Sequence, residues 1–215
     1  MKRKILASIL GVAAMVAATS SYGQGKINLN NYNGTGKQIL YGAGSGGTVG
    51  NGILNGTPAA AATWTVGFYY ALGDVTASVG ADATGTKDPS TLGGGLGFAT
   101  GAPGDTTVIK NSLPGGGYFQ TTADAIINGW SAGSITVEAV AYNGADYNSS
   151  SLRGHSAAFL FTPIASTALA GGPAISTTAG GMPNFSVFAV PEPSTFALAG
   201  IGAAALMAFR RKKQA

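Results

Sequence analysis

A serine inside a glycine-flanked pentapeptide is the residue whose setting is closest to that of a catalytic nucleophile. Gly129-Trp130-Ser131-Ala132-Gly133 fits the pattern G-x-S-x-G, and Asp146 and His155 follow in the order serine, acid, histidine. A nucleophile elbow needs a strand before the serine and a helix after it, whereas here a β-rich segment follows Ser131. Asp146 and His155 also follow too soon for that arrangement. We therefore predict that the protein is not an enzyme, with a serine hydrolase using Ser131 as a remote alternative.

Metal and cofactor motifs are weak in this sequence. His155 is the only histidine, whereas a catalytic zinc usually takes two or three, and the glycine-rich run 42–47 lacks the Lys-Ser/Thr of a phosphate loop. Calcium stays open because carboxylate and carbonyl oxygens suffice to bind it. The weak candidate groups for calcium are Asp82 with Asp88, and Asp146 with Asn143 and Asn148. We predict no metal site and no cofactor.

Aromatic side chains are the more serious binding candidates. Tyrosine and tryptophan rings can stack on the apolar face of a sugar while their polar atoms meet its rim. We assign Trp64 and Phe68 to the core and keep Tyr69, Tyr142 and Tyr147 as possible ligand-stacking residues. This possibility motivates an alternative function, a secreted carbohydrate-binding module.

The sequence predicts strands for the segments that position these residues. Apolar and polar residues alternate over 64–72, and β-forming residues dominate 134–142, 157–161 and 185–189. Weaker strands are expected at 26–30, 38–41, 75–79, 106–109 and 118–121, and one short helix at 122–128. Strands and helices do not alternate, so a parallel α/β sheet is disfavoured. We predict an all-β fold, an antiparallel β-sandwich with Greek-key connections as one option.

The N-terminus has the organisation of a secretory signal peptide. Lys2, Arg3 and Lys4 precede an apolar run from Ile5 to Ala18, and small residues follow up to Gly23. Cleavage after Gly23 would leave Gln24 as the mature N-terminus, and cleavage after Ser20 is the alternative. We therefore predict a signal peptide at 1–23 and a glycine-rich β-sandwich domain at 24–189.

Charge and cysteine content limit the partners of this body. The chain has a net charge of +4, but three of its 12 basic residues lie at 2–4 and four at 210–213, so the remaining body is mildly acidic. The basic pI therefore reflects the two ends, and we predict no binding to nucleic acid. No cysteine is present, so an exported body has to be held together by packing rather than by disulfides.

The C-terminus combines a stiff segment, an apolar run and a cationic end. Pro191-Glu192-Pro193 favours extended backbone, which suits recognition by a processing enzyme. The uncharged run 196–209 would be about 21 Å long as a helix, shorter than a hydrocarbon core of about 30 Å, which also allows a buried helix. Arg210, Arg211, Lys212 and Lys213 favour membrane insertion, because a basic block at the end of an apolar run stays in the cytoplasm. The predicted membrane helix contains Phe196, Leu198, Ile201, Leu206, Met207 and Phe209.

These tail features, over 190–215, resemble the PEP-CTERM sorting domain of Gram-negative bacteria. The resemblance implies export, a transient stay in the inner membrane, and cleavage near Pro-Glu-Pro by the membrane enzyme exosortase. Many proteins with this tail are associated with exopolysaccharide or biofilm matrix. We expect an exported, noncatalytic surface or extracellular-matrix protein. Its expected partners are exosortase, the secretion machinery and the inner membrane, with exopolysaccharide as a further candidate.

Overall fold

The computed structural model describes residues 24–32, 37–56, 63–112, 114–162, 164–166, 171–175, 181–190 and 201. The signal peptide predicted at 1–23 lies outside these residues, as does the predicted tail apart from Val190 and Ile201. The strands are β1 (Gly25–Asn30), β2 (Ile39–Tyr41), β3 (Thr65–Leu72), β4 (Gly97–Phe98), β5 (Thr107–Val108), β6 (Gln120–Ile127), β7 (Ile135–Tyr142), β8 (Leu152–His155), β9 (Phe159–Phe161), β10 (Ala165–Ser166) and β11 (Phe185–Ala189). Two short 3-10 helices, η1 (Thr76–Ser78) and η2 (Pro89–Thr91), lie between β3 and β4.

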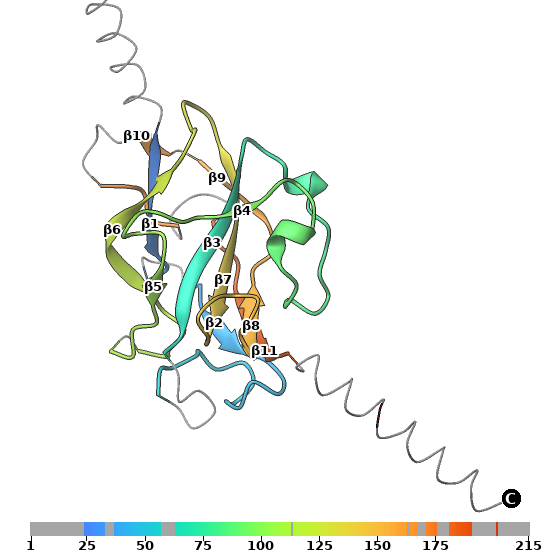
Figure 1. Cartoon of the computed structure of the whole chain (residues 1–215). Helices are drawn as coiled ribbons and strands as arrows, with labels where there is room; N and C mark the ends of the chain where they lie inside the picture. Colours follow the sequence, from blue (N-terminus) through green and yellow to red (C-terminus); the bar gives the residue numbers. More distant parts are fainter. Residues whose placement is uncertain are drawn as a thin grey trace, which may run out of the picture.

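The strands form two sheets, so the predicted all-β class is confirmed (Figure 1). The smaller sheet has the order β10-β1-β6, and the larger sheet has the order β2-β11-β8-β7-β3-β4. β5 pairs with β3, and β9 pairs with β7. The longest pairing joins β3 and β7 antiparallel over eight residue pairs, from Thr65 opposite Tyr142 to Leu72 opposite Ile135. β3 and β7 therefore form the longest continuous ladder of the larger sheet.

One strand pair departs from the antiparallel prediction. β11 runs parallel to β2, with Phe185 opposite Ile39 and Val187 opposite Tyr41. A parallel pair needs a long crossover connection, and here nearly the whole body lies between the two strands in sequence. On its other edge β11 pairs antiparallel with β8. The last strand of the body thus joins the second strand to the middle of the larger sheet.

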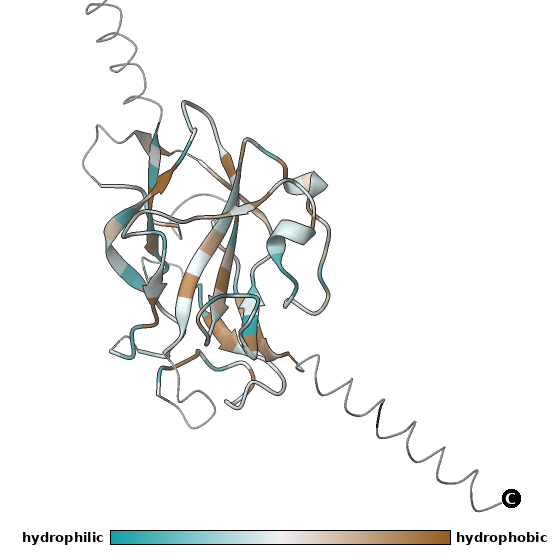
Figure 2. Cartoon of the chain, in the orientation of Figure 1, coloured by the Kyte–Doolittle hydropathy of each residue, from teal (hydrophilic) through white to brown (hydrophobic). Residues whose placement is uncertain are grey.

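Both sheets contribute to the main hydrophobic core. Ile27 and Ile127 of the smaller sheet belong to the same buried cluster as Val66, Phe68 and Val137 of the larger sheet. Apolar residues accordingly mark β3 and β7 through the middle of the body (Figure 2). Trp64 and Phe68, predicted as core, are fully buried. Burial of these side chains, at about 25 cal/mol per Å² of apolar area, provides the main driving force for folding.

A second apolar cluster lies on the other face of β3 and β7. It contains Tyr69, Leu96, Val140, Tyr142 and Tyr147. Every residue of β7 is buried, so this strand is covered on both faces rather than on one. The cover over the second face comes from the segment between β3 and β4 and from the loop between β7 and β8.

Several predicted elements need correction. The helix expected at 122–128 is wrong, because these residues mostly belong to β6, where pairing with β1 overrides the helix preference of alanine. The strand expected at 75–79 is instead η1 with its flanking residues. The continuous apolar run 157–161 yields a strand only at 159–161, and β8 was not predicted at all.

Candidate functional site

The most unusual chemistry in the described residues is a histidine held between two carboxylates. The ring of His155, on β8, has Nε2 at 3.2 Å from Oδ2 of Asp82 and Nδ1 at 3.2 Å from Oε2 of Glu138. Nδ1 also lies 2.8 Å from the carbonyl oxygen of Ser156. The side chains of all three titratable residues are at most 5% exposed. A doubly protonated ring would donate a hydrogen from each nitrogen and would balance part of the negative charge.

The chain around Asp82 is folded to surround its carboxylate. Oδ1 accepts hydrogen bonds from the backbone and hydroxyl of Thr84, at 2.9 and 2.6 Å. Oδ2 accepts from the backbone N–H groups of Thr86 and Lys87, at 2.9 and 2.8 Å. Burial opposes ionisation of Asp82, but these bonds, together with the one from His155, keep its pKa well below the ordinary value. The carboxylate is therefore a fixed negative charge under the loop 82–87.

Burial also opposes the charged form of His155, and three neighbouring groups reverse that effect on its pKa. The interactions with Glu138, the Ser156 carbonyl and Asp82 together raise the pKa of His155 above its ordinary value. Glu138 itself lies in the middle of β7 and is 1% exposed. The cluster therefore joins β7, β8 and the loop 82–87 by charge-assisted contacts.

A cavity of about 330 Å³ adjoins this cluster. Small side chains such as Val79, Ala81 and Ala157 line it together with the three charged groups. Ser156 is no nucleophile for it, since its hydroxyl donates to the Ala157 carbonyl and accepts from the Ala139 N–H. No group of three metal-ligating side chains in the described part of the chain is arranged to hold an ion. The cluster can exchange protons, but its geometry is that of a structural contact that holds the loop 82–87 against the larger sheet. We call Asp82, Glu138 and His155 the clamp.

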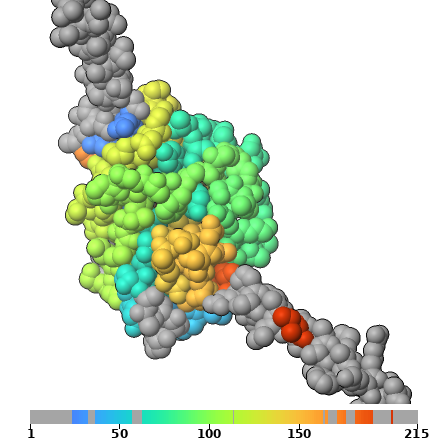
Figure 3. Space-filling model, viewed as in Figure 1, coloured from blue at the N-terminus to red at the C-terminus, as the bar shows by residue number. Residues whose placement is uncertain are grey.

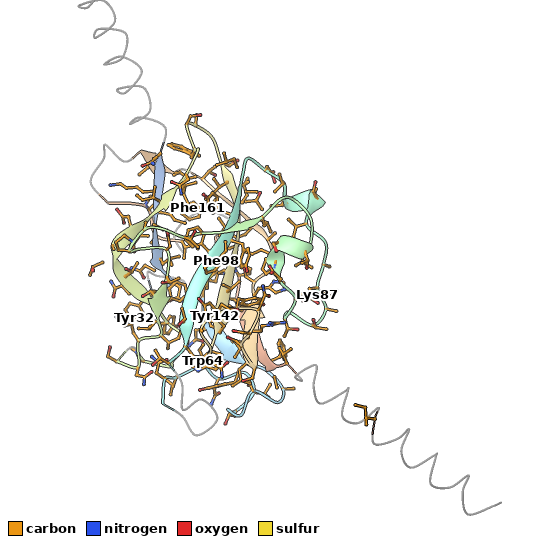
Figure 4. All side chains as sticks on the ribbon, viewed as in Figure 1. Tyr32, Trp64, Lys87, Phe98, Tyr142 and Phe161 are labelled. Atoms are coloured by element: carbon orange, nitrogen blue, oxygen red, sulfur yellow. The ribbon has the colours of Figure 1, made fainter. Side chains whose placement is uncertain are left out.

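The loop next to the clamp is held by Arg153 as well. Nε of Arg153 donates to the Thr86 carbonyl at 2.8 Å, and the guanidinium carbon lies 5.2 Å from the centre of the Tyr147 ring. By contrast, Lys87 is 60% exposed at the periphery of the body and reaches Asp82 only at 4.0 Å (Figure 4). The buried contacts of His155 and the partly buried contacts of Arg153 therefore dominate the attachment of this loop.

The three tyrosines predicted to stack on a ligand are packed against one another. Tyr69, Tyr142 and Tyr147 are 5%, 4% and 3% exposed. The Tyr147 ring meets the Tyr69 and Tyr142 rings edge-on, with centroids 6.3 and 6.1 Å apart. Burial, together with nearby charges, raises the pKa values of all three phenols. The prediction of a stacking platform is wrong for these residues, because no ring face is open to a ligand.

The residues of the hydrolase alternative are not brought together. Ser131 is exposed in the connection between β6 and β7. Asp146 accepts hydrogen bonds from the N–H and hydroxyl of Ser149, at 2.9 and 2.8 Å. His155 faces Asp82 and Glu138 rather than either of them. The order of the three residues in the sequence therefore does not reflect a shared site.

The weak calcium candidates are also occupied by protein donors. Asp88 caps η2 by accepting from the N–H of Ser90 at 2.9 Å, and its other oxygen accepts from Asn148. Asn143 accepts from the N–H of Leu152 at 3.0 Å. These oxygens stabilise turns, as short polar side chains in loops commonly do.

Sequence reasoning missed Glu138 as a partner of His155. A sequence signal was present, since Glu138 is the only charged residue within the apolar strand 134–142. A charged residue in a strand buried on both faces needs a partner of opposite charge. The distance in sequence to Asp82 and His155 hid the identity of that partner.

The described residues form an all-β body, and the C-terminal tail follows its last strand, β11, directly in the sequence. Residues 189–212 match the family model of the PEP-CTERM protein-sorting motif, so the chain carries this motif. The motif marks a protein that exosortase sorts to the cell surface through a membrane-anchored stage. Neither the curated proteins nor the solved structures contained a match to the chain.

Most of the tail residues named from the sequence, including Pro191, Glu192, Pro193 and the basic block, lie outside the described residues. Ile201 is described and is 67% exposed. Within the described residues, none of the helices has the length and apolar character to cross a membrane.

Proposed function

We propose that the protein is an exported, noncatalytic component of the cell surface or extracellular matrix. In this proposal it is anchored briefly in the inner membrane and then released by exosortase. The match of residues 189–212 to the sorting motif carries the proposal. The uncharged run and the four cations that follow it fit a temporary membrane anchor.

The position of β11 supports a cut between body and anchor. Ala189, the last residue of β11, pairs with Leu152, and the N–H of Val190 donates to the Ser151 carbonyl at 2.8 Å. The loop that contains Ser151 and the end of β11 lie side by side on one face of the molecule (Figure 3). Pro191 therefore follows the folded body with no intervening linker. A cut after Val190 would remove the anchor and leave every described strand in place.

The N-terminal processing prediction fits the same scheme. Gln24 is exposed, and β1 begins at the next residue, Gly25, which is buried. Cleavage after Gly23 would therefore release a chain whose first strand is complete. Cleavage within β1 would remove pairs with β6 and β10.

The carbohydrate-binding alternative loses the residues that motivated it. Tyr69, Tyr142 and Tyr147 are enclosed in the second apolar cluster, so a sugar cannot stack on them without unfolding that face. Any sugar site on this body has to use other residues.

Intact-mass measurement of protein recovered from the surface of a host containing exosortase tests the proposal. We expect a species that lacks the signal peptide and ends near Pro191–Pro193. Replacing Arg210 to Lys213 with glutamines should leave more uncleaved or misplaced protein, because the basic block fixes the orientation of the anchor. Replacing Lys37 and Lys110 of the body, which are both partly exposed, with glutamines is the matched charge control and should leave processing unchanged. Surface protein that still ends at Ala215 would contradict the proposal.

A further inference from the structure

An open groove lies at the end of the body formed by two loops. One loop follows β2 and returns to it at Gly52, which bridges to Leu40. The other connects Ile109 to Phe119. The groove between them has a volume of about 1170 Å³. It is larger than a typical small-molecule pocket of about 300–1,000 Å³, so it has room for part of a polymer chain.

Both walls of the groove are fixed by hydrogen bonds. The backbone of Tyr41 donates to the Asn51 carbonyl at 2.8 Å and accepts from the N–H of Gly50 at 2.9 Å. Nε2 of Gln38 donates to the carbonyls of Gly115 and Gly116, at 3.2 and 3.0 Å. A ligand would therefore meet a preformed surface and would not have to order these loops on binding.

Glycine brings the two loops into direct backbone contact at the base of the groove. A Cβ atom on Gly52 would lie 2.3 Å from the Gly115 carbonyl oxygen. Asn55 and Asn111 add two reciprocal hydrogen bonds. The backbone N–H of Asn55 donates to Oδ1 of Asn111, and Nδ2 of Asn111 donates to the carbonyl of Asn55, both at 2.8 Å. The separation of the walls is thus set by close packing rather than by flexible side chains.

The described part of the groove's lining is uncharged. Its described lining residues include no aspartate, glutamate, lysine, arginine or histidine. They instead present amide and hydroxyl side chains, among them Thr48, Asn51 and Ser112, which are all exposed. Each of these groups both donates and accepts hydrogen bonds. Leu54 and Pro114 supply apolar surface between them.

The uncharged polar and apolar groups of the described lining indicate which kind of ligand the groove suits. A polyanion such as a nucleic acid would need cations in the groove to neutralise it, and an ionic ligand would leave its charge unpaired there. A chain that carries many hydroxyls, each donor and acceptor, next to apolar C–H surface matches the lining. We propose that the groove between the loop 42–54 and residues 111, 112 and 114–116 binds a neutral polysaccharide. This binding belongs to the body itself and does not depend on how the tail is processed.

Calorimetric titration of the full chain in detergent tests the proposal with named probes. The neutral probes are gluco-, manno- and galacto-oligosaccharides together with the uncharged exopolysaccharide fraction of the host. Alginate oligosaccharides and an uncharged peptide are the comparison ligands. We expect at least one neutral glycan to bind and the comparison ligands to bind at least about tenfold more weakly. Alginate would find no charge partner in the described lining, and the uncharged peptide lacks the many hydroxyl groups that match it.

Two groove variants and two matched controls locate the binding. Asn51→Ala removes an exposed side-chain amide, and the hydrogen bonds described for Asn51 involve its backbone alone. This change should weaken binding about five- to tenfold, the effect of one lost hydrogen bond. Thr48→Trp places a bulky ring in the lining of the groove and should block binding. Asn128→Ala and Thr122→Trp make the same changes at exposed positions on and beside β6 and should bind as the parent does.

The outcomes separate the possibilities. Failure of every neutral glycan to bind overturns the proposal, and so does binding that Thr48→Trp leaves intact. Preferential binding of the peptide or of alginate, lost in Thr48→Trp, would assign the groove to another class of ligand and would also overturn it. Unchanged melting temperatures of the variants establish that a loss of binding is not a loss of fold.

Discussion

At the scale of single residues, the triad Asp82–His155–Glu138 makes stability depend on pH in two opposite ways. The pKa of His155 is raised in the folded protein, so its contribution is complete below its ordinary pKa of about 6.5 and is lost as pH rises through the raised value. The pKa of Asp82 is lowered, so its contribution is present above about pH 4 and is lost as pH falls. The clamp therefore stabilises the fold most between about pH 4 and 6.5.

Substitution of the histidine should remove the alkaline part of this dependence. We expect His155→Gln to lower the free energy of unfolding by about 3–5 kcal/mol near pH 6, because it leaves buried Glu138 and Asp82 without their cation. The loss should shrink as pH rises. Thermal unfolding followed by circular dichroism from pH 4 to 9 measures it. Lys87→Gln, which removes an exposed charge near the same aspartate, should change stability by less than about 1 kcal/mol. A parallel shift of His155→Gln at every pH would contradict this account.

At the scale of elements, local pattern predicted the strands that carry alternating or β-branched residues and failed where tertiary pairing decides. β3, β7 and β11 lie where the sequence placed strands. β6 contains Ala123, Asp124 and Ala125, which favour helix or turn over strand in isolation. In the structure Asp124 is paired across the sheet with Lys26 at 3.6 Å and with Asn28 at 3.1 Å. A partner 96 residues away cannot be read from one segment, and the same limit hid the partners of His155.

The contact between β8 and β11 depends on a residue without a side chain. A Cβ atom on Gly154 would lie 2.1 Å from the Ser186 carbonyl oxygen and 2.9 Å from the Cα of Val187. We expect Gly154→Ala to destabilise the body by about 1–3 kcal/mol, since backbone has to move to admit a methyl group. Urea unfolding measures this loss. Gly97→Ala, in β4, is the control, because a Cβ atom there meets nothing within 4 Å. Equal midpoints for the two variants would show that the sheet tolerates the added methyl group.

At the scale of the whole molecule, β11 completes the larger sheet. It contributes buried Phe185 and Val187 to the main core and pairs with both β2 and β8. Without it β2 would lose its parallel partner, and β8 would keep only β7. The tail that the sorting motif identifies is therefore attached to a strand on which the closure of the sheet depends.

Truncation at two nearby positions tests this dependence. A chain that ends at Val190 keeps β11 and should resist proteolysis like the parent body. A chain that ends at Asn184 lacks β11 and should be degraded rapidly, because it exposes the core residues that β11 covers. Limited proteolysis followed by mass spectrometry compares the two. Similar resistance of both chains would mean that β11 is dispensable.

The direct passage from β11 into the sorting motif also limits how far the body can stand from a membrane. Five residues separate Val190 from the apolar run that begins at Phe196. At about 3.3–3.6 Å per residue, these positions span less than about 22 Å even when fully extended. In a folded precursor anchored as proposed, the body would remain within that height of the bilayer, and the processing enzyme would have to work in the gap. If β11 had not yet joined the sheet, its residues would lengthen the connection between the body and the membrane anchor. The distance of the body from the bilayer would therefore show whether the last strand is in place.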